Sequence, residues 1–430
     1  MDKNGSNYRE SRKQEIRERV IDTAELVRRE EEEEAKEKKR RTRRRRVLII
    51  VLVILFLLIA GTSYYLIHRQ YTSFTVNWRS EGDGAQAAIT DSDYEEYLPF
   101  SKGFLKVTRD GASYIDAQGK TVWNQSYEMN TPYVSVNGDF CAIADQDRTG
   151  IYIASDAGPT GQAETNLPIT KIAVSGIGVV YALLEDSSAS YITVFAKDGT
   201  ALDISIKSIL SGDGYPLDIS VSPDGTELIA SFVSLAGGTL ENKIIFYNLG
   251  QVGQSAGNNR VVGGFTDDFA GHLTGRVHFS DDTHAQAFYD GGIAFFSTKV
   301  LTSPELLKKA EITGTIRAIA YDDELVGVIA DNDQENADSP YLLHVYRTNG
   351  QTVFEKPISF HYSGFTIDRN RILLYNDTSL QIYDGSGNLK FDGTVDVPVR
   401  NARIAQDIRG AFGVNVLIGS SGVMESIKLH

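Results

Sequence analysis

The sequence has little of what redox and metal-dependent enzymes use. Its 430 residues include one cysteine, Cys141, together with two tryptophans and seven histidines. With one cysteine no internal disulfide can form, and Cys141 stands in the apolar run 140–144, where we expect a small buried side chain. The motif His-Glu-x-x-His, which places two zinc ligands and a general base on one helix face, is absent.

Charge is absent from one long segment. Residues 47–67 read VLIIVLVILFLLIAGTSYYLI, 21 residues without Asp, Glu, Lys or Arg. A helix of that length rises about 30 Å, which matches the hydrocarbon core of a bilayer. Residues 11–46 contain neither Pro nor Gly. The sequence therefore predicts a transmembrane helix over residues 47–67, preceded by a charged cytoplasmic helical segment over residues 1–46.

Positive charge gathers directly before this apolar segment. Nine of the eleven residues 36–46 are Lys or Arg, whereas only His68 and Arg69 follow the segment before Trp78. This bias places the N-terminus in the cytoplasm and residues 68–430 outside the cell, with membrane lipid as the partner of residues 36–71. Nucleic-acid binding is the alternative for a basic run, and its position against the apolar segment disfavours it. The basic cluster predicted at the membrane interface comprises Lys38, Lys39, Arg40, Arg41, Arg43, Arg44, Arg45 and Arg46.

Residues 68–430 lack any long helical pattern. Short β-branched and aromatic runs alternate there with Gly, Asp, Asn and Ser clusters, which is typical of strands and turns. One unit recurs: an apolar strand, a turn that ends in Gly, and a second strand. Its eight copies begin near residues 113, 151, 191, 243, 293, 341, 379 and 423, a mean step of about 44 residues that is typical of four-stranded propeller blades.

This spacing predicts an all-β propeller with eight blades. The last copy ends at His430 without room for a fourth strand, and a strand-like run over residues 74–78 stands before the first copy. We therefore expect residues 74–78 to supply the missing strand and to close the ring, which leaves no open sheet edge. Seven blades with an irregular first unit are the alternative.

Two runs resemble the repeats of known propellers. Residues 114–123, YIDAQGKTVW, resemble the repeat of quinoprotein-type propellers, and residues 221–226, VSPDGT, resemble the inner turn of WD-type and Tol-type propellers. The whole arrangement is similar to uncharacterised membrane-anchored propeller proteins of Gram-positive bacteria, a family of unknown function. These resemblances imply a fold and carry no catalytic residue across.

The sequence predicts no enzyme. The quinoprotein resemblance would imply a cysteine pair, metal-binding carboxylates and many tryptophans, whereas here only Trp123 takes the repeat tryptophan position, and Phe354 and Phe391 take its equivalents. Residues 253–257, GQSAG, match the letters of the Gly-x-Ser-x-Gly nucleophile elbow, which needs a strand that enters a helix. A polar turn that leads into a strand follows them, so we expect a plain blade loop.

Two acidic loops are the candidates for a metal site. Asp145 and Asp147 stand in one loop, and Asp331 and Asp333 stand in the other. Oxygen-rich loops of this kind can bind Ca²⁺, but neither completes the twelve-residue calcium loop with its terminal bidentate Glu. Solvated turns are therefore the favoured interpretation, and no cofactor is predicted.

Three histidines spaced six residues apart, His272, His278 and His284, raise a weaker metal hypothesis. The last two are expected on opposite strands of one hairpin, with Asp281 and Asp282 in its turn. This spacing is unspecific, so ordinary polar surface is the favoured interpretation.

The different net charges of the N-terminal segment and the propeller indicate which kinds of partner the protein binds. Residues 1–46 carry 17 Lys or Arg against 12 Asp or Glu, whereas residues 68–430 carry 26 against 45. An acidic propeller disfavours nucleic acid and favours a basic envelope protein or a neutral ligand. We expect a cell-surface, single-pass protein whose propeller is a non-enzymatic binding module. A transmembrane sensor that couples the propeller to the cytoplasmic helix, and an enzyme with an unrecognised site in the propeller funnel, are the alternatives.

Overall fold

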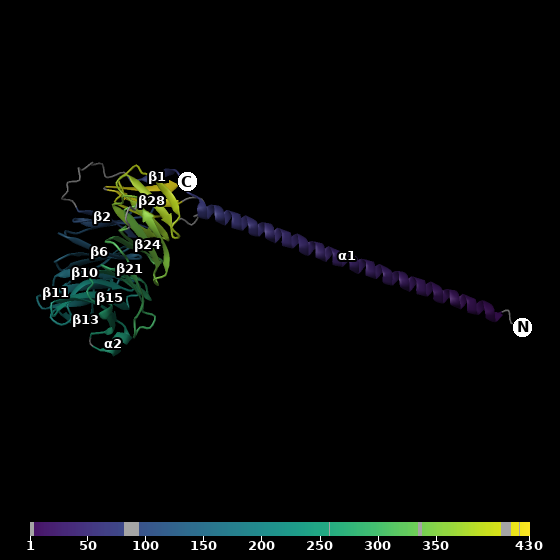
Figure 1. Cartoon of the computed structure of the whole chain (residues 1–430), viewed down its shortest axis with the longest axis horizontal. Helices are drawn as coiled ribbons and strands as arrows, with labels where there is room; N and C mark the ends of the chain where they lie inside the picture. The colour runs from purple at the N-terminus through teal and green to yellow at the C-terminus, as the bar shows by residue number, and fades with distance from the viewer. Residues whose placement is uncertain (1–3, 81–93, 258, 334–337, 406–413, 421) are drawn as a thin grey trace. The chain divides into compact units, whose positions relative to one another are not determined.

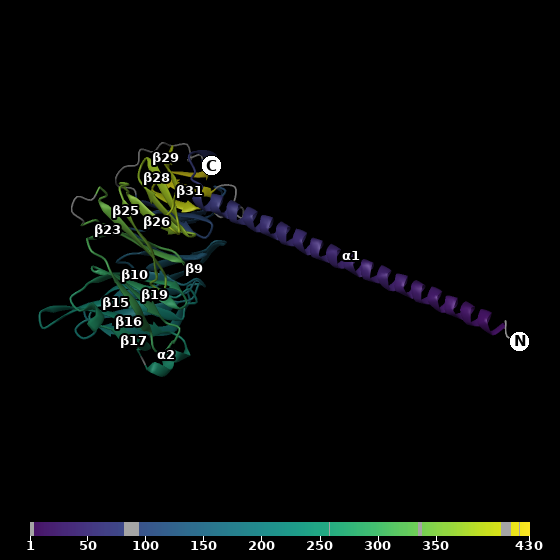
Figure 2. The same cartoon turned by 45° about the vertical axis from the view of Figure 1, so that its right-hand side comes forward.

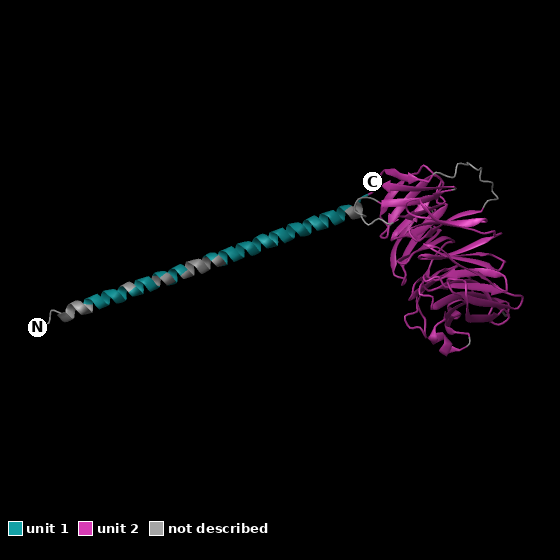
Figure 3. Cartoon of the chain, turned by 180° about the vertical axis from the view of Figure 1, so that it is seen from behind, with its two compact units in different colours: residues 1–69 teal, residues 70–430 magenta. Residues whose placement is uncertain are grey.

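The computed structural model describes residues 4–80, 94–257, 259–333, 338–405, 414–420 and 422–430. The chain divides into two compact units, residues 1–69 and 70–430, which Figure 3 colours separately. The first unit contains the helix α1 (Asn4–His68), and the second contains strands with two short helical turns.

Helix α1 contains a stretch long and apolar enough to cross a membrane. Within Lys38–Tyr65, an 18-residue window has a mean hydropathy of 2.8, and none of that window is buried within the protein. Large apolar side chains such as Phe56 and Leu57 are 69% and 62% exposed. A run of exposed apolar side chains of this length is suited to an apolar surrounding such as a bilayer.

The second unit is an eight-bladed β-propeller, as the repeat spacing predicts. Each blade is a four-stranded antiparallel sheet whose strands lie side by side, as β15, β16 and β17 do in Figure 2. Blade 1 contains β2 (Glu95–Phe100), β3 (Gly103–Thr108), β4 (Gly111–Ile115) and β5 (Thr121–Ser126). Blade 2 contains β6 (Pro132–Asn137), β7 (Phe140–Asp145), β8 (Gly150–Ser155) and β9 (Gly158–Glu164). Blade 3 contains β10 (Ile169–Val174), β11 (Val180–Glu185), β12 (Ala189–Phe195) and β13 (Ala201–Ile209).

The remaining blades follow in chain order, and the colour of Figure 1 runs through them from teal to yellow. Blade 4 contains β14 (Tyr215–Val221), β15 (Glu227–Ala236), β16 (Thr239–Asn248) and β17 (Val261–Phe265), with α2 (Gln251–Ala256) between the last two strands and the 3₁₀ turn Asp267–Phe269 after them. Blade 5 contains β18 (Thr274–Asp281), β19 (His284–Tyr289), β20 (Gly292–Ser297) and β21 (Glu305–Glu311). Blade 6 contains β22 (Ile316–Tyr321), β23 (Leu325–Asp331), β24 (Tyr341–Arg347) and β25 (Thr352–Ile358). Blade 7 contains β26 (Gly364–Asp368), β27 (Arg371–Tyr375), β28 (Ser379–Asp384) and β29 (Leu389–Thr394).

The eighth blade joins the two ends of the propeller. Its sheet runs β1 (Phe74–Arg79), β32 (Val423–Leu429), β31 (Val414–Ser420) and β30 (Asn401–Ile404), so the first strand of the chain supplies the outermost strand of the last blade. The rings of Phe74 and Phe391 meet edge to face at 6.4 Å between centroids. Pairing of the two chain ends removes a free sheet edge from the last blade.

The recurring unit of the sequence is the third strand of each blade and the turn that follows it. Two of the turn glycines, Gly199 and Gly387, have φ values of 85° and 82°. A Cβ on Gly199 would lie 1.9 Å from the backbone oxygen of Gln162 in the preceding blade. The turn glycine is thus required both by its left-handed backbone and by the close approach of the neighbouring blade.

Side chains fill the spaces between blades and form one apolar cluster at each junction. At the junction of blades 7 and 8, for example, the fully buried Leu373 and Leu380 pack against Ala402 and Val416. Because strand side chains alternate between the two faces of a sheet, each blade contributes one face to each junction.

Side-chain acceptors of one innermost strand bind the backbone of the next. Ser135 Oγ accepts a hydrogen bond of 3.0 Å from the amide of Val174, and Ser220 Oγ accepts one of 3.0 Å from Phe279. These bonds satisfy amides that an edge strand would otherwise leave unpaired. They hold the innermost strands in fixed positions around the axis of the ring.

Candidate functional site: the central channel

A cavity of about 620 Å³ occupies the centre of the propeller. It is bounded by all eight innermost strands, β2, β6, β10, β14, β18, β22, β26 and β30, or by the turns that follow them. A volume of this size lies within the range of small-molecule sites, which is about 300–1,000 Å³. We call this cavity the channel.

Arg276 on β18 provides a cation that faces the channel. Its Nε and Nη2 donate hydrogen bonds of 3.2 Å and 3.0 Å, and both end on the hydroxyl of Tyr321. The nearest carboxylate oxygen belongs to Asp218, 3.8 Å from Nε, beyond hydrogen-bond distance. The Arg276 side chain is 44% exposed, whereas that of Asp218 is 1% exposed.

The groups around Arg276 keep this wall of the channel rigid. Asp218 Oδ2 accepts the amide of Val277 at 2.9 Å, and burial raises the pKa of Asp218 although Arg276 opposes this shift. The ring of His278 stacks on that of Tyr321 with 3.7 Å between centroids. Burial and the charge of Arg276 lower the pKa of His278 to about 3, so its imidazole is neutral at physiological pH.

The second arginine of the channel, Arg403, is differently placed. Its side chain is 6% exposed, its Nε lies 3.3 Å from Oδ2 of Asp368, and Nη1 donates to the carbonyl of Gly103 at 2.7 Å. Asp368 Oδ2 also accepts the amide of Ile404 at 2.8 Å. This ion pair joins blades 7 and 8, and its charges are neutralised within the protein.

Acidic residues lie in the channel lining where β22 ends. Asp322 Oδ1 accepts the amides of Glu324 and Leu325 at 2.9 Å and 2.7 Å, and its Oδ2 accepts that of Asn370 at 3.3 Å. Burial raises the pKa of Asp322, and these amides oppose that shift. The next residue, Asp323, is exposed, and its carboxylate makes no hydrogen bond to the described residues.

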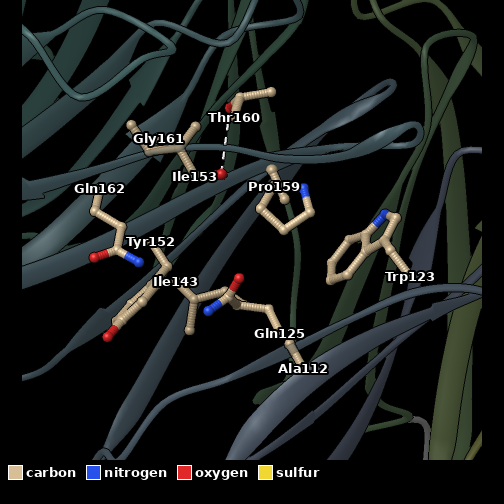
Figure 4. A pocket seen from close by; sticks show the side chains of 11 residues that line it. Ala112, Trp123, Gln125, Ile143, Tyr152, Ile153, Pro159, Thr160, Gly161 and Gln162 are labelled. Carbon is tan, nitrogen blue, oxygen red and sulfur yellow. Dashed lines mark hydrogen bonds between the residues drawn. The ribbon is translucent and has the colours of Figure 1, made fainter.

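A smaller crevice of about 270 Å³ lies between the outer strands of blades 1 and 2. Figure 4 shows Trp123 at one end of it and Gln162 at the other, with Pro159 and Tyr152 between them. Trp123 is only 8% exposed, and the lining contains no charged side chain. The crevice is thus a gap in blade packing with amide and aromatic walls, unlike the charged channel.

The residues predicted as calcium ligands have other partners in the structure. Asp145 ends β7, and its Oδ1 accepts the amides of Asn130 and Thr131 at 3.0 Å and 2.8 Å. Asp331 ends β23 and forms two hydrogen bonds, of 2.8 Å and 2.7 Å, with Arg317. These bonds lower the pKa of Asp331.

The two other predicted calcium ligands, Asp147 and Asp333, are exposed. Among the described residues, no three His, Cys, Asp or Glu side chains are close enough to share a metal ion. The geometry of the described part of these loops therefore lends the calcium interpretation no support.

The three histidines of the weaker metal hypothesis lie apart from one another. His272 Nδ1 lies 2.7 Å from Asp290, and His284 Nδ1 lies 2.8 Å from Asp281. His278 faces the channel. His278 and His284 do occupy the two strands of one hairpin, as expected.

The run Gly-x-Ser-x-Gly includes a short helix, where a plain loop is the expectation from sequence. Helix α2 covers residues 251–256, between β16 and β17. Ser255 lies in the last turn of α2 and donates its hydroxyl to the carbonyl of Gln251 at 3.0 Å. A nucleophile elbow exposes its serine at the start of a helix, so this geometry differs from that motif.

Sequence reasoning assigned the repeat tryptophan position to Trp123 alone, and this was wrong. Trp123 on β5 donates its indole N–H to the carbonyl of Ser155 in the next blade at 2.9 Å. Trp78 on β1, which is the fourth strand of blade 8, donates in the same way to Ala117 of blade 1 at 3.2 Å. The equivalence was hidden because Trp78 stands before the first repeat in sequence and after the last one in space.

Sequence reasoning also missed Arg276 and Tyr321, and neither belongs to a recognisable motif. The one available signal was a charged residue within a first strand of a blade, because alternate side chains of that strand face the channel. The eight residues of the basic cluster lie on α1 with their side chains exposed, and their place at a membrane interface stays a prediction.

A family model described as "Family of unknown function (DUF5711)" matches residues 67–429. The chain belongs to this family. The match covers the whole propeller of this DUF5711 protein, including β1, which closes the ring. No curated protein matches the chain.

Several solved propellers are similar to the DUF5711 chain in fold. The WD40 domain of Pan2 from Neurospora crassa has 11% identity and a TM-score of 0.40, over 69% of this chain and 88% of that one. Sqt1 from Chaetomium thermophilum, bound to the N-terminus of the ribosomal protein L10, has 12% identity and a TM-score of 0.45, over 77% and 92%. The propeller of the Trilobed protease from Pyrococcus furiosus has 13% identity and a TM-score of 0.39, over 70% and 94%.

Proposed function

We propose that this DUF5711 protein is a membrane-anchored binding module whose propeller lies outside the cell and takes its ligand in the channel. The observation that carries the proposal is the built wall of the channel: the cation of Arg276 is held by Tyr321 and backed by the buried Asp218, and it faces a cavity of about 620 Å³. Polar groups that converge in a largely preformed cavity are typical of a ligand site.

A non-enzymatic role agrees with the geometry of the channel. Its one histidine, His278, stacks on Tyr321 and makes no hydrogen bond to a serine, threonine or cysteine of the described residues. A nucleophile needs a base within about 3 Å, and none of the described channel residues forms such a pair.

The proposed anchor rests on the apolar stretch of α1 and on the charges beside it. The exposed basic cluster directly precedes the apolar residues, and such clusters stay on the cytoplasmic side, where they contact anionic lipid. This topology places the propeller, with its 45 Asp or Glu against 26 Lys or Arg, in the cell envelope. An envelope protein or a small soluble ligand is then the partner, and nucleic acid is disfavoured.

Capture on the full-length protein tests the binding module. The chain is reconstituted in nanodiscs, immobilised, and exposed to an envelope protein extract and to soluble cell-wall fragments. We expect retention of at least one component by the wild type and its loss from the Arg276→Gln variant, with the Arg317→Gln variant as a surface control. Equal retention by all three proteins, or none by any of them, would contradict the proposal.

A transmembrane sensor is the second candidate, and the continuity of α1 from Asn4 to His68 favours it. An unbroken helix can transmit a displacement along its whole length. Removal of residues 1–36 leaves the span and the propeller in place and tests this reading. A cellular phenotype that persists unchanged without these residues would rule out the sensor.

A further inference from the structure

We propose that the ligand of the channel is a short peptide with free ends, whose carboxylate binds Arg276 and whose ammonium group lies beside Asp322 and Asp323. This inference rests on the proposed function and deepens it, because it names the ligand class of the same cavity. Its basis is the opposite charge of two parts of one channel lining.

The comparison of the two channel arginines identifies Arg276 as the anion-binding group. Arg403 is buried and has a carboxylate oxygen at 3.3 Å, so its charge is already neutralised. Arg276 is 44% exposed and has tyrosine hydroxyls, of Tyr321 and Tyr133, as its hydrogen-bond acceptors, with the nearest carboxylate 3.8 Å away. A guanidinium that faces a cavity without a hydrogen-bonded carboxylate is suited to bind one from a ligand.

The surroundings of Arg276 favour a singly charged carboxylate over a phosphate. Asp218 lies behind the guanidinium, and the propeller as a whole carries 19 more acidic than basic residues. A doubly charged anion is repelled by this field more strongly than a zwitterion, which brings its own cation. A ligand with both charges therefore fits the channel better than an anion alone.

The acidic end supplies the complement for an ammonium group. Both oxygens of Asp322 accept backbone amides, which fixes the carboxylate in place at the end of β22. Asp323 follows it, exposed and without a hydrogen bond to described residues, so its oxygens are available to a ligand. Two neighbouring carboxylates of this kind favour a cation that donates several hydrogen bonds, as an ammonium does.

The two charged parts of the lining meet at the end of β22. The hydroxyl of Tyr321 binds the guanidinium of Arg276, and Tyr321 directly precedes Asp322 in the chain. A short peptide can therefore contact both parts, and the neutral His278, whose ring stacks on Tyr321, offers it polar contact without charge.

The experiment measures how three forms of one peptide bind the full-length protein in nanodiscs. Tetra-alanine with free ends, the same peptide with a C-terminal amide, and its N-acetylated form are titrated by calorimetry, with inorganic phosphate as a fourth probe. We expect the free peptide to bind at least tenfold more tightly than either blocked form, and phosphate to bind more weakly than the free peptide.

Three variants assign each end of the peptide to its residue. Arg276→Gln is expected to weaken binding of the free peptide at least tenfold. The free peptide should then bind no more tightly than its C-terminal amide, but still more tightly than its N-acetylated form. Asp323→Asn is expected to reduce only the difference in affinity between the free peptide and its N-acetylated form. Arg317→Gln, an exposed arginine paired with Asp331 and absent from the channel lining, is the matched control and should bind like the wild type.

Several results would overturn the peptide assignment. These are equal binding of the three peptides, tighter binding of phosphate, or undiminished binding by Arg276→Gln. If Arg276→Gln does not fold, as judged by its circular dichroism melt, Arg276→Lys keeps a charge without the paired donors and should still weaken the free peptide. Failure of all the peptides, with capture of an envelope component still dependent on Arg276, would refute the peptide and leave the binding module standing.

Discussion

At the scale of single residues, the most unusual group outside the channel is a carboxylate enclosed in protein. Glu227 begins β15 and is 1% exposed. Burial, with Asp224 and Asp282 nearby, raises its pKa to about 7, although the side chain of Thr298 opposes this shift. A buried carboxyl avoids most of its desolvation penalty by remaining protonated.

This carboxyl predicts a specific dependence of stability on pH. Because the pKa is about 7 in the folded state, above the ordinary glutamate value of 4.5, the folded protein binds more protons between these values, and its stability falls as pH rises through that window. The loss is on the order of 3 kcal/mol. The Glu227→Gln variant should lack this contribution, so urea midpoints at pH 4.5 to 8 should diverge from wild type as pH rises. If the difference between the urea midpoints of the wild type and the variant stays constant from pH 4.5 to 8, the raised pKa of Glu227 is contradicted. Glu241→Gln, on the next strand, is the control.

The two tryptophans give a second prediction at this scale. Substitution of Trp123 by Phe keeps most of the apolar volume and removes the hydrogen bond to the Ser155 carbonyl in the next blade. The carbonyl loses its donor, so we expect destabilisation of about 1–2 kcal/mol, measured as a shift of the denaturation midpoint. Trp78→Phe should behave alike because its bond to Ala117 is equivalent. A neutral effect of both changes would show that these indoles act by packing alone.

At the scale of an element, the turn after the third strand of each blade explains why the repeat is visible in sequence. The backbone of the turn requires a left-handed residue at one position, and neighbouring blades pack directly against it. In blade 7, for example, a Cβ on Gly387 would lie 3.0 Å from the ring of Phe354. Glycine is thus fixed by local geometry and by tertiary contact at once, so it recurs even where the rest of the unit has diverged.

A pair of glycine substitutions separates these two requirements. Gly199 and Gly138 both have positive φ, 85° and 58°, but a Cβ would clash with Gln162 only at Gly199 and would meet open space at Gly138. Gly138→Ala should therefore destabilise by about 1 kcal/mol through backbone strain alone. Gly199→Ala should destabilise by several kcal/mol because a neighbouring blade must also shift. Equal effects on the melting temperature would refute the role assigned to blade contact.

At the scale of the whole molecule, closure of the ring joins parts of the chain that are far apart in sequence. Strand β1 pairs with β32 from Phe74 to Arg79, and Arg79 reaches the fully buried Glu425 of β32. Loss of β1 would leave an unpaired strand edge and a buried carboxylate without its cation.

Deletion of residues 73–80 tests this closure. We expect a loss of several kcal/mol, which for a domain of this size lowers the melting temperature by roughly 5 °C. Association that grows with protein concentration should accompany it, because the free edge of β32 can pair with another chain. Circular dichroism and light scattering measure the two effects, and Val76→Thr, at an exposed position of the same strand, is the control. A deletion protein that melts like wild type would show that closure does not depend on β1.

Much of the fold could be predicted because its determinants are local and repeated. The turn glycines, the strand spacing and the two incomplete ends were sufficient for eight blades and for the role of residues 74–78. The short helix α2 was missed because its six residues carry no apolar periodicity, and contacts with β16 and β17 place it. The equivalence of Trp78 and Trp123 was missed because sequence order hides circular neighbours.

The candidate site was the part that the sequence could not provide. Arg276, Asp218, Tyr321 and Asp322 come from three different blades, and none of them stands in a motif. Whether these residues form one site depends on the distances between the innermost strands, and the number of blades around the axis sets those distances.

The sequence alone determined the apolar stretch of α1, the basic cluster beside it and the repeat, because each depends on composition or spacing along the chain. Only the tertiary structure decided which charges face the channel and which are neutralised. Arg403 and Arg276 are alike as residues, yet one is paired with Asp368 and the other faces a cavity. Charge is a property of the residue, whereas its neutralisation depends on what the fold brings within hydrogen-bond distance.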